Sequence, residues 1–279
     1  MKFADLHMHT SYSDGDYGIE EVIEMANKAG LKSLAITDHD RCDHFDKIKE
    51  IGKNYHIRLV KGLEISAYDF DSQKKVHIVG LFLPEKTPEI DKLNAITNKK
   101  REAYHISLLE DLRKDGFDLD YDFVKRFAPN SIIYKSDIFW ALKDKYPDKM
   151  DGVGFKDIFN EETTDKLAET MGYISVKDAI GAINKDGGLS VLAHPQEYDN
   201  WDEIEKYKDM GLGAIEINNS RMKDKDFSRA RDFAKRLNLL MSGGSDFHRL
   251  GRFDLGDYGL SKDEFIRLEE KFNEKYSNS

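Results

Sequence analysis

The sequence predicts an α/β protein whose parallel sheet, with helices packed outside it, is closed into a barrel or nearly so. Short apolar segments alternate with helical segments over residues 1–86 and again from Ser175 onward. Repeated strand–helix units of this kind give parallel sheets covered by helices. A second observation agrees, because residues able to bind metal follow several apolar segments, and functional side chains of such barrels gather where strands end. These residues are His7, His39, Glu64, His194 and Asp246.

The elements of the first third follow from apolar periodicity and from local stop signals. Ile19, Val22, Ile23 and Ala26 recur at helical spacing, and Gly30 ends that helix. The expected strands are 2–6, 31–37, 57–65 and 76–83, and the expected helices are 19–29 and 45–52.

The pattern changes over residues 87–172, where helical stretches and charged turns replace the alternation and no strand is expected. Thr87 is a suitable N-cap and Pro88 suits the first helical position, so we expect a long helix that runs to Gly116. We interpret 87–172 as a helical insertion that covers the mouth of a barrel formed by residues 1–86 and 173–279.

The strand–helix alternation then resumes and continues to the last helix, which the capping box of Ser261 and Glu264 opens. The expected helices are 175–186, 202–210 and 224–237, and the expected strands are 189–193, 214–217 and 239–242.

Composition limits the classes of function. With 279 residues, 39% of them hydrophobic, the chain can bury a large core. The one cysteine, Cys42, excludes an intramolecular disulfide and a cysteine-based zinc site, and it fits a reducing cytoplasm. We find neither an apolar signal region nor a run long enough to span a membrane. The net charge of −10 argues against a long nucleic acid held through its phosphates, so an anionic substrate has to be attracted locally, by bound cations.

Histidine and carboxylate side chains converging at strand ends are the ligands of a multinuclear metal site. His7 and His9 alternate after the first strand, so both project to one side, and Asp246 and His248 repeat this spacing after two glycines that permit close backbone approach. Pro195 favours an extended backbone at His194. The remaining candidates are Asp14, His39, Glu64 and His77.

Each candidate also has a plainer explanation. The pair at residues 7 and 9 could lie on the surface, Asp14 could form a turn before Gly15, and Glu64 could occupy an exposed edge. His77 could be an ordinary core residue. Asp5 and Asp38 are candidates to orient ligating imidazoles, with an N-cap as the alternative for Asp38. We expect the other histidines, which are His44, His56 and His105, to be surface or helix residues.

Taken together, these segments resemble the PHP (polymerase and histidinol phosphatase) family of metal-dependent phosphoesterases. The matching segments are Asp5–Thr10, Ser13–Gly15, Thr37–Asp40, Gly62–Ser66, Val76–Gly80, Leu192–Pro195 and Gly243–His248. They occur in the family's order, cover about residues 1–86 and 174–260, and are most similar to the stand-alone branch that cleaves small phosphomonoesters.

The resemblance implies a distorted, TIM-like (β/α)7 barrel with a helical insertion and two to three divalent metal ions, which could be Mn, Fe, Zn or Mg. By motif, the metal ligands are His7, His9, Asp14, His39, Glu64, His77, His194, Asp246 and His248. Two positions depart from the stand-alone pattern. Lys135–Asp137 stands where an Arg-Pro-His-like segment is common, and Arg249 stands where glycine is common.

The expected substrate is a small phosphorylated molecule, most simply a nucleotide: a nucleoside 3′,5′-bisphosphate, AMP or a short oligonucleotide. Three divalent cations and the three carboxylate ligands would give a site charge of about +3, which favours a compact dianion over a neutral amide. The resemblance implies hydrolysis by a metal-activated hydroxide. Arg101, and after it Lys135 and Arg249, are the candidates to hold phosphate. The alternatives are a histidinol-phosphate phosphatase, a metal-dependent amidohydrolase and a non-catalytic metal-binding module.

Overall fold

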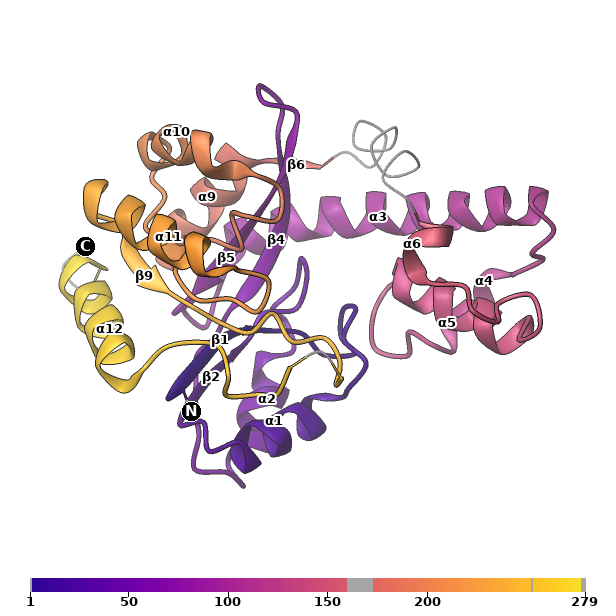
Figure 1. The fold of residues 1–279 in the computed structure, drawn as a ribbon, viewed down its shortest axis with the longest axis horizontal. Coiled ribbons are helices and arrows are strands. Elements are labelled where there is room, and N and C mark those ends of the chain that lie inside the picture. The colour runs from indigo at the N-terminus through magenta and orange to yellow at the C-terminus, as the bar shows by residue number, and fades with distance from the viewer. Residues whose placement is uncertain (1, 160–172, 252, 277–279) are drawn as a thin grey trace.

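Two hydrogen-bonded sheets form the centre of the larger part of the molecule in the computed structural model, which describes residues 2–159, 173–251 and 253–276 (Figure 1). The first sheet is parallel and has the order β1 (Ala4–Met8), β2 (Ser33–Ile36), β3 (Arg58–Leu59). The second has the order β6 (Ile174–Ser175), β4 (Leu63–Asp69), β5 (Lys74–Leu81), β7 (Leu189–Leu192), β8 (Ala214–Glu216), β9 (Leu240–Ser242).

The two sheets meet along two edges. Isolated parallel bridges pair Met8 with Phe247 and His39 with Glu64. The backbone nitrogen of His9 donates to the oxygen of Phe247 at 2.8 Å, and the nitrogen of Asp246 donates to the oxygen of His7 at 2.8 Å. Because these bridges involve or adjoin predicted metal ligands, sheet pairing itself brings distant ligands together.

Helices cover the outside of both sheets (Figure 1). In α1 (Ile19–Lys28), the residues of the predicted apolar stripe are all buried. The other outer helices are α2 (Phe45–Gly52), α9 (Val176–Lys185), α10 (Ile204–Asp209), α11 (Asp224–Arg236) and α12 (Lys262–Tyr276), and a 3-10 turn, η1, spans Asn200–Glu203. The predicted capping box is present before α12, because the backbone nitrogen of Ser261 donates to Glu264 and the backbone nitrogen of Glu264 donates to the hydroxyl of Ser261.

A long helix, α3 (Pro88–Lys114), extends from the larger part and carries a smaller group of helices at its far end (Figure 1). These are α4 (Tyr121–Lys125), α5 (Lys135–Lys145) and α6 (Phe155–Ile158). They share a second hydrophobic cluster with the end of α3, whereas Ile90 near its start belongs to the main core. Over 87–159 only helices and turns occur, as expected, and 160–172 lie outside the described residues.

The expectation of an all-parallel arrangement is wrong at one strand. β5 runs antiparallel to both β4 and β7. Only residues 70–73 connect β4 to β5, with Gln73 at φ 57°, and such a short connection makes a hairpin, since a parallel pair needs a crossover of roughly a dozen residues or more. The predicted strand 57–65 is in fact two strands, β3 and β4, so Glu64 lies at the beginning of β4 rather than at a strand end.

None of the helices that the structure describes is long and apolar enough to cross a membrane.

Candidate metal centre

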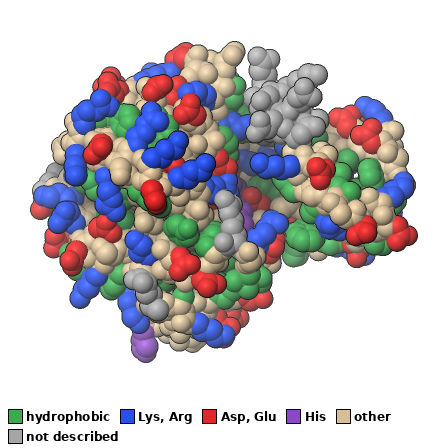
Figure 2. Space-filling view, viewed as in Figure 1, with side chains coloured by type: hydrophobic (Ala, Val, Ile, Leu, Met, Phe, Trp, Pro, Cys, Tyr) green, Lys and Arg blue, Asp and Glu red, His purple; other side chains and the backbone are tan. Residues whose placement is uncertain are grey.

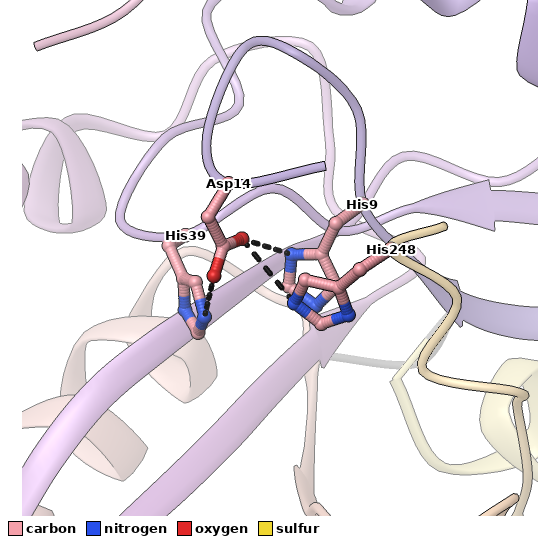
Figure 3. Close-up of side chains that lie close together, drawn as sticks. All are labelled: His9, Asp14, His39 and His248. Atoms are coloured by element: carbon pink, nitrogen blue, oxygen red, sulfur yellow. Dashed lines mark ion pairs between the residues drawn. The ribbon is translucent and has the colours of Figure 1, made fainter. Parts of the chain in front are cut away.

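The structure gathers all nine predicted ligands into one cluster, whose outer group is drawn in Figure 3. Their donor atoms form four overlapping groups, within each of which all atoms lie within 4.8 Å of one another. The groups are His9, Asp14, His39, His248; His7, His9, Glu64, Asp246; His39, Glu64, His77; and His194, Glu197, Asp246. Glu197 is the one member that the sequence did not predict.

Glu64 is the central carboxylate of the cluster. Its Oε1 lies 3.0 Å from Nδ1 of His77 and 2.9 Å from Nε2 of His194. Its Oε2 faces the opposite group, 3.3 Å from Nε2 of His7 and 3.2 Å from Nε2 of His9. Burial raises the pKa of Glu64, but the surrounding histidines, His7 first among them, outweigh burial and hold it well below its usual range. A carboxylate with its two oxygens directed to different imidazole groups is arranged to bridge two cations.

Asp14 closes the outer group, as Figure 3 shows. Its Oδ1 lies 3.3 Å from Nε2 of His248 and 3.6 Å from Nδ1 of His9, and its Oδ2 lies 3.8 Å from Nε2 of His39. The loop that carries Asp14 returns so closely to His9 that a Cβ at Gly15 would lie 2.7 Å from the backbone of His9. Glycine is therefore required beside this predicted ligand.

Asp246 divides its oxygens between the cluster and an arginine. Oδ1 lies 3.3 Å from Nε2 of His9 and 3.5 Å from Nδ1 of His248, whereas Oδ2 lies 2.9 Å from a terminal nitrogen of Arg221. The residue adopts φ 56°, and a Cβ at Gly244 would lie 2.3 Å from the Cβ of His7. The close approach that the sequence predicted for the glycines before Asp246 is confirmed.

A carboxylate that the sequence did not predict orients two of the predicted ligands. Oε1 of Glu216 lies 2.7 Å from Nδ1 of His7, and Oε2 accepts a hydrogen bond of 2.7 Å from the backbone nitrogen of His194. Glu216 ends β8 and is 1% exposed. Glu64 was predicted because it is a glutamate at the end of an apolar segment. The sequence around Glu216 shows the same feature, so Glu216 could have been predicted in the same way.

The orienting roles expected for Asp5 and Asp38 are wrong. Asp5 accepts from the backbone nitrogens of His7 and Ser245, and Asp38 accepts from the backbone and hydroxyl of Thr10 and from Ser13. Both carboxylates therefore anchor the loops that carry ligands, not the ligating rings. Asp38 is not an N-cap either, because α2 begins after His44.

Two histidines expected at the surface or on a helix are buried. His44 is 7% exposed, its Nε2 lies 2.8 Å from Oδ2 of Asp38, and its ring stacks on Tyr12. His105 does lie on α3, as expected, but it is 3% exposed, and burial lowers its pKa well below the usual value. His56 is exposed, as expected.

The cluster opens into a cleft of about 1130 Å³ that borders both the larger part and the helical part. Figure 2 shows Lys and Arg side chains along the hollow between the two. All three predicted phosphate-holding residues lie on its wall: Arg101, Lys135 and Arg249. Arg101 forms an ion pair with the buried Asp40, and Arg249 lies 3.7 Å from Asp16 with its side chain 41% exposed. Further basic residues of the wall, which the sequence did not single out, are Lys75, Lys156, Arg221, Lys223, Lys225 and Arg229.

The donor set fits divalent transition metals. Imidazole nitrogens and carboxylate oxygens are their usual protein ligands, and Oδ1 of Asp14 and Nδ1 of His194 are buried without a hydrogen-bond partner in the described residues. Such buried polar atoms are costly unless something else satisfies them. Fold and site thus define the class of a metal-dependent hydrolase.

Comparison with known proteins agrees. The PHP domain matches residues 5–220, and the chain belongs to this family. A phosphoribosyl 1,2-cyclic phosphate 1,2-diphosphodiesterase from Eggerthella lenta is 33% identical over 252 residues, which are 89% of this chain and 94% of that protein. A 5′-3′ exoribonuclease from Haemophilus influenzae is 29% identical over 96% of this chain and 98% of its own. A 3′,5′-nucleoside bisphosphate phosphatase from Chromobacterium violaceum is 29% identical over 88% and 87%.

Two solved structures share the fold. A protein from Bifidobacterium adolescentis that is proposed to be a metal-dependent phosphoesterase superposes with a TM-score of 0.85 and 25% identity, over 96% of this chain and 95% of its own. An amidohydrolase from Chromobacterium violaceum with bound sulfate superposes with a TM-score of 0.82 and 25% identity, over 96% of both chains. The chain is a hydrolase, a metal-dependent phosphoesterase of the PHP type.

Proposed function

We propose that this enzyme hydrolyses small phosphomonoesters, with nucleotides (a nucleoside 3′,5′-bisphosphate, AMP or a short oligonucleotide) as the substrate class. The observation that carries the proposal is a largely buried histidine–carboxylate cluster that borders a cleft whose wall holds at least nine basic side chains. In a chain of net charge −10, this local concentration of cations attracts an anion that the rest of the surface repels.

We infer that the nine motif residues bind two or three divalent cations, which could be Mn, Fe, Zn or Mg, with Glu64 as the bridging ligand. Divalent cations at this cluster would supply Lewis-acid polarisation of a phosphoryl oxygen and a lowered pKa for a water molecule. The protein's own part is orientation. Glu216 fixes the ring of His7, and Asp38 holds the loop of Asp14 through Thr10 and Ser13.

The size of the cleft supports a substrate larger than inorganic phosphate, since ligand pockets of about 300–1,000 Å³ take drug-sized molecules. Aromatic side chains on its wall can stack against a base or cover a ribose; they are Tyr104, Tyr134, Phe155, Tyr173 and Tyr198.

We propose that residues 87–172 form an insertion that sets specificity over the metal site. The bridges between the sheets support a distorted (β/α)7 barrel for residues 1–86 and 173–279. The free, buried Cys42 fits the proposed cytoplasmic location.

A second candidate substrate is a five-membered cyclic phosphate of a phosphorylated ribose. It is favoured by the relative from Eggerthella lenta, whose name describes hydrolysis of phosphoribosyl 1,2-cyclic phosphate, at 33% identity over nearly the whole of both chains. The nucleoside 3′,5′-bisphosphate and the cyclic phosphate each combine a ribose with two phosphate groups, which a metal cluster surrounded by basic side chains would bind in a similar way.

The test is a substrate panel with Mn²⁺-loaded protein, with and without chelator. The panel contains adenosine 3′,5′-bisphosphate, AMP, a 5′-phosphorylated dinucleotide, phosphoribosyl 1,2-cyclic phosphate, histidinol phosphate and p-nitrophenyl phosphate. Chelator-sensitive turnover of a nucleotide well above histidinol phosphate is the expected result. Turnover of the cyclic phosphate alone would select the second candidate, and turnover of histidinol phosphate alone would contradict both.

A further inference from the structure

Arg221 forms an ion pair with Asp246, one of the predicted metal ligands, and the proposed function gives it no role. It follows β8 in the loop that leads to α11, and its side chain lines the cleft. One terminal nitrogen forms an ion pair with Oδ2 of Asp246 at 2.9 Å, while Oδ1 of the same carboxylate faces His9 at 3.3 Å. Asp246 therefore links the guanidinium directly to the cluster.

A second carboxylate holds the other terminal nitrogen. This nitrogen donates to Oε1 of Glu197, whose Oε2 lies 3.4 Å from Nδ1 of His194. The backbone is anchored as well, because the nitrogen of Arg221 donates to Oδ1 of Asn219 at 3.0 Å, and the amide of Asn219 reaches Oε2 of Glu216 at 3.3 Å. The residue that orients His7 thus also fixes the loop of the arginine.

These contacts leave donors of Arg221 available to the cleft. A guanidinium has four terminal N–H groups besides Nε–H. One of them donates to Glu197, whereas the contact with Asp246 is an ion pair without hydrogen-bond geometry. The side chain remains 28% exposed although it is paired on two sides. Planar arginine donors held in one orientation are suited to phosphate oxygens.

Electrostatics favours an anion at this place. A guanidinium next to a ligand of divalent cations is repelled by them, and it is poorly explained as a structural element of the metal site alone. The repulsion becomes attraction when a dianionic group lies between the arginine and the cations. Arg221 is thus placed to make a favourable electrostatic interaction with the site only when an anionic substrate is bound.

We propose that Arg221 binds a non-reacting phosphoryl oxygen of the substrate through its terminal N–H groups, while Glu197 and Asp246 fix the orientation of the guanidinium. This inference rests on the proposed phosphoesterase function and names a further binding residue for it. Arg221 then faces the phosphoryl group from the side of β8 and α11, whereas Arg101 belongs to α3.

The experiment compares Arg221→Gln, Arg221→Lys and a matched control, Arg236→Gln, which removes a positive charge from α11 at a residue paired with Glu205 outside the cleft wall. Binding of inorganic phosphate to Mn²⁺-loaded protein is measured by calorimetry, metal content by elemental analysis, and KM and kcat on the best substrate of the panel. We expect Arg221→Gln to weaken phosphate binding and raise KM by about 10- to 100-fold at unchanged metal content, with Arg221→Lys between it and wild type.

Three results would overturn the inference. The first is phosphate binding by Arg221→Gln as tight as that of wild type, and the second is absence of phosphate binding by the wild type. The third is a loss of metal from Arg221→Gln while its metal-loaded fraction binds phosphate with unchanged affinity, which would mean that Arg221 only supports Asp246. Failure of the proposed function is a separate result, because wild-type protein would then hydrolyse nothing in the panel whatever the phosphate affinities of the variants.

Discussion

Nδ1 of His7 lies 2.7 Å from Oε1 of Glu216, while Nε2 of the same ring lies 3.3 Å from Oε2 of Glu64. The ring is thus fixed from behind by one carboxylate and presented to the cluster on its other side. Partners that orient ligating histidines in this way set the tautomer and raise ligand basicity.

Glu216→Gln should therefore lower metal affinity by about 10- to 100-fold while the fold is retained. The amide keeps an oxygen for the backbone of His194 but loses the charge that holds His7. Metal titration of the chelator-treated protein measures the effect. Glu270→Gln, on the exposed face of α12, is the control and should titrate as wild type. Equal affinities for both variants would contradict an orienting role.

Asp14 and Glu64 should differ in how many cations their loss removes. Glu64 belongs to two of the donor groups and Asp14 to one. We expect Asp14→Asn to bind fewer metal ions per chain than wild type, and Glu64→Gln to bind fewer still. Elemental analysis after equilibration with Mn²⁺ gives the counts. If both variants lose the same number of metal ions per chain, the cation sites are not separate, contrary to what the donor groups indicate.

Removal of metal should destabilise the fold as well as stop catalysis. Six of the nine predicted ligands are buried, and cations that bind only the folded chain stabilise it by about 2.7 kcal/mol at a concentration one hundred times Kd. Thermal unfolding with Mn²⁺ and with chelator tests this, and Tm should fall in chelator and recover when metal is restored. An unchanged Tm would mean that the cluster is satisfied without cations.

Arg101→Gln should raise KM by about tenfold at unchanged metal content, because Arg101 lies on the cleft wall with its charge held by Asp40. Arg113→Gln is the matched control, since Arg113 lies on the same helix and is paired with Asp118 outside the cleft wall. Steady-state kinetics on one substrate with both variants is sufficient. If KM and kcat of Arg101→Gln equal those of the control, Arg101 only supports the loop of Asp40.

The sequence predicted those parts of the site that are encoded locally. His7, His39, His194 and Asp246 each lie within or just after a short apolar strand, and most element bounds follow from periodicity and caps. The pairing of strands within the sheets could not be predicted from the local sequence in the same way. β5 forms its hairpin with the adjacent β4, but its other neighbour in the sheet, β7, lies over a hundred residues further along the chain.

Long-range partners account for the other differences. Glu216 acts on a histidine 209 residues away, and Arg221 acts on Asp246 through a loop that turns back only when β8 and β9 pair. His44 is buried because Asp38 and Tyr12, which come from separate loops, close over it. Nothing in the neighbouring sequence of these residues specifies such partners, so they follow from the assembled fold.

The last prediction concerns the pH dependence of stability in the helical part. Burial raises the pKa of Asp137 from 3.8 to about 7, although its carboxylate accepts a hydrogen bond of 2.7 Å from the backbone nitrogen of Tyr134. The folded chain therefore retains a proton that the unfolded chain releases near pH 4, and this contribution to stability is lost as pH rises from about 4 to about 7. Asp137→Asn cannot ionise and keeps an oxygen for the cap.

We expect Asp137→Asn and wild type to be about equally stable at pH 4 and the variant to be more stable above pH 7. Urea unfolding of both proteins across this range, compared at each pH, cancels the titration of shared groups that do not interact with residue 137. Asp157→Asn, at the equivalent cap position of α6, is the control, because its carboxylate accepts from the backbone nitrogen of Gly154 and its side chain lies at an exposed position. A difference between wild type and Asp137→Asn that stays constant with pH would mean that Asp137 is ionised throughout, held so by Lys125 and the helix N-terminus.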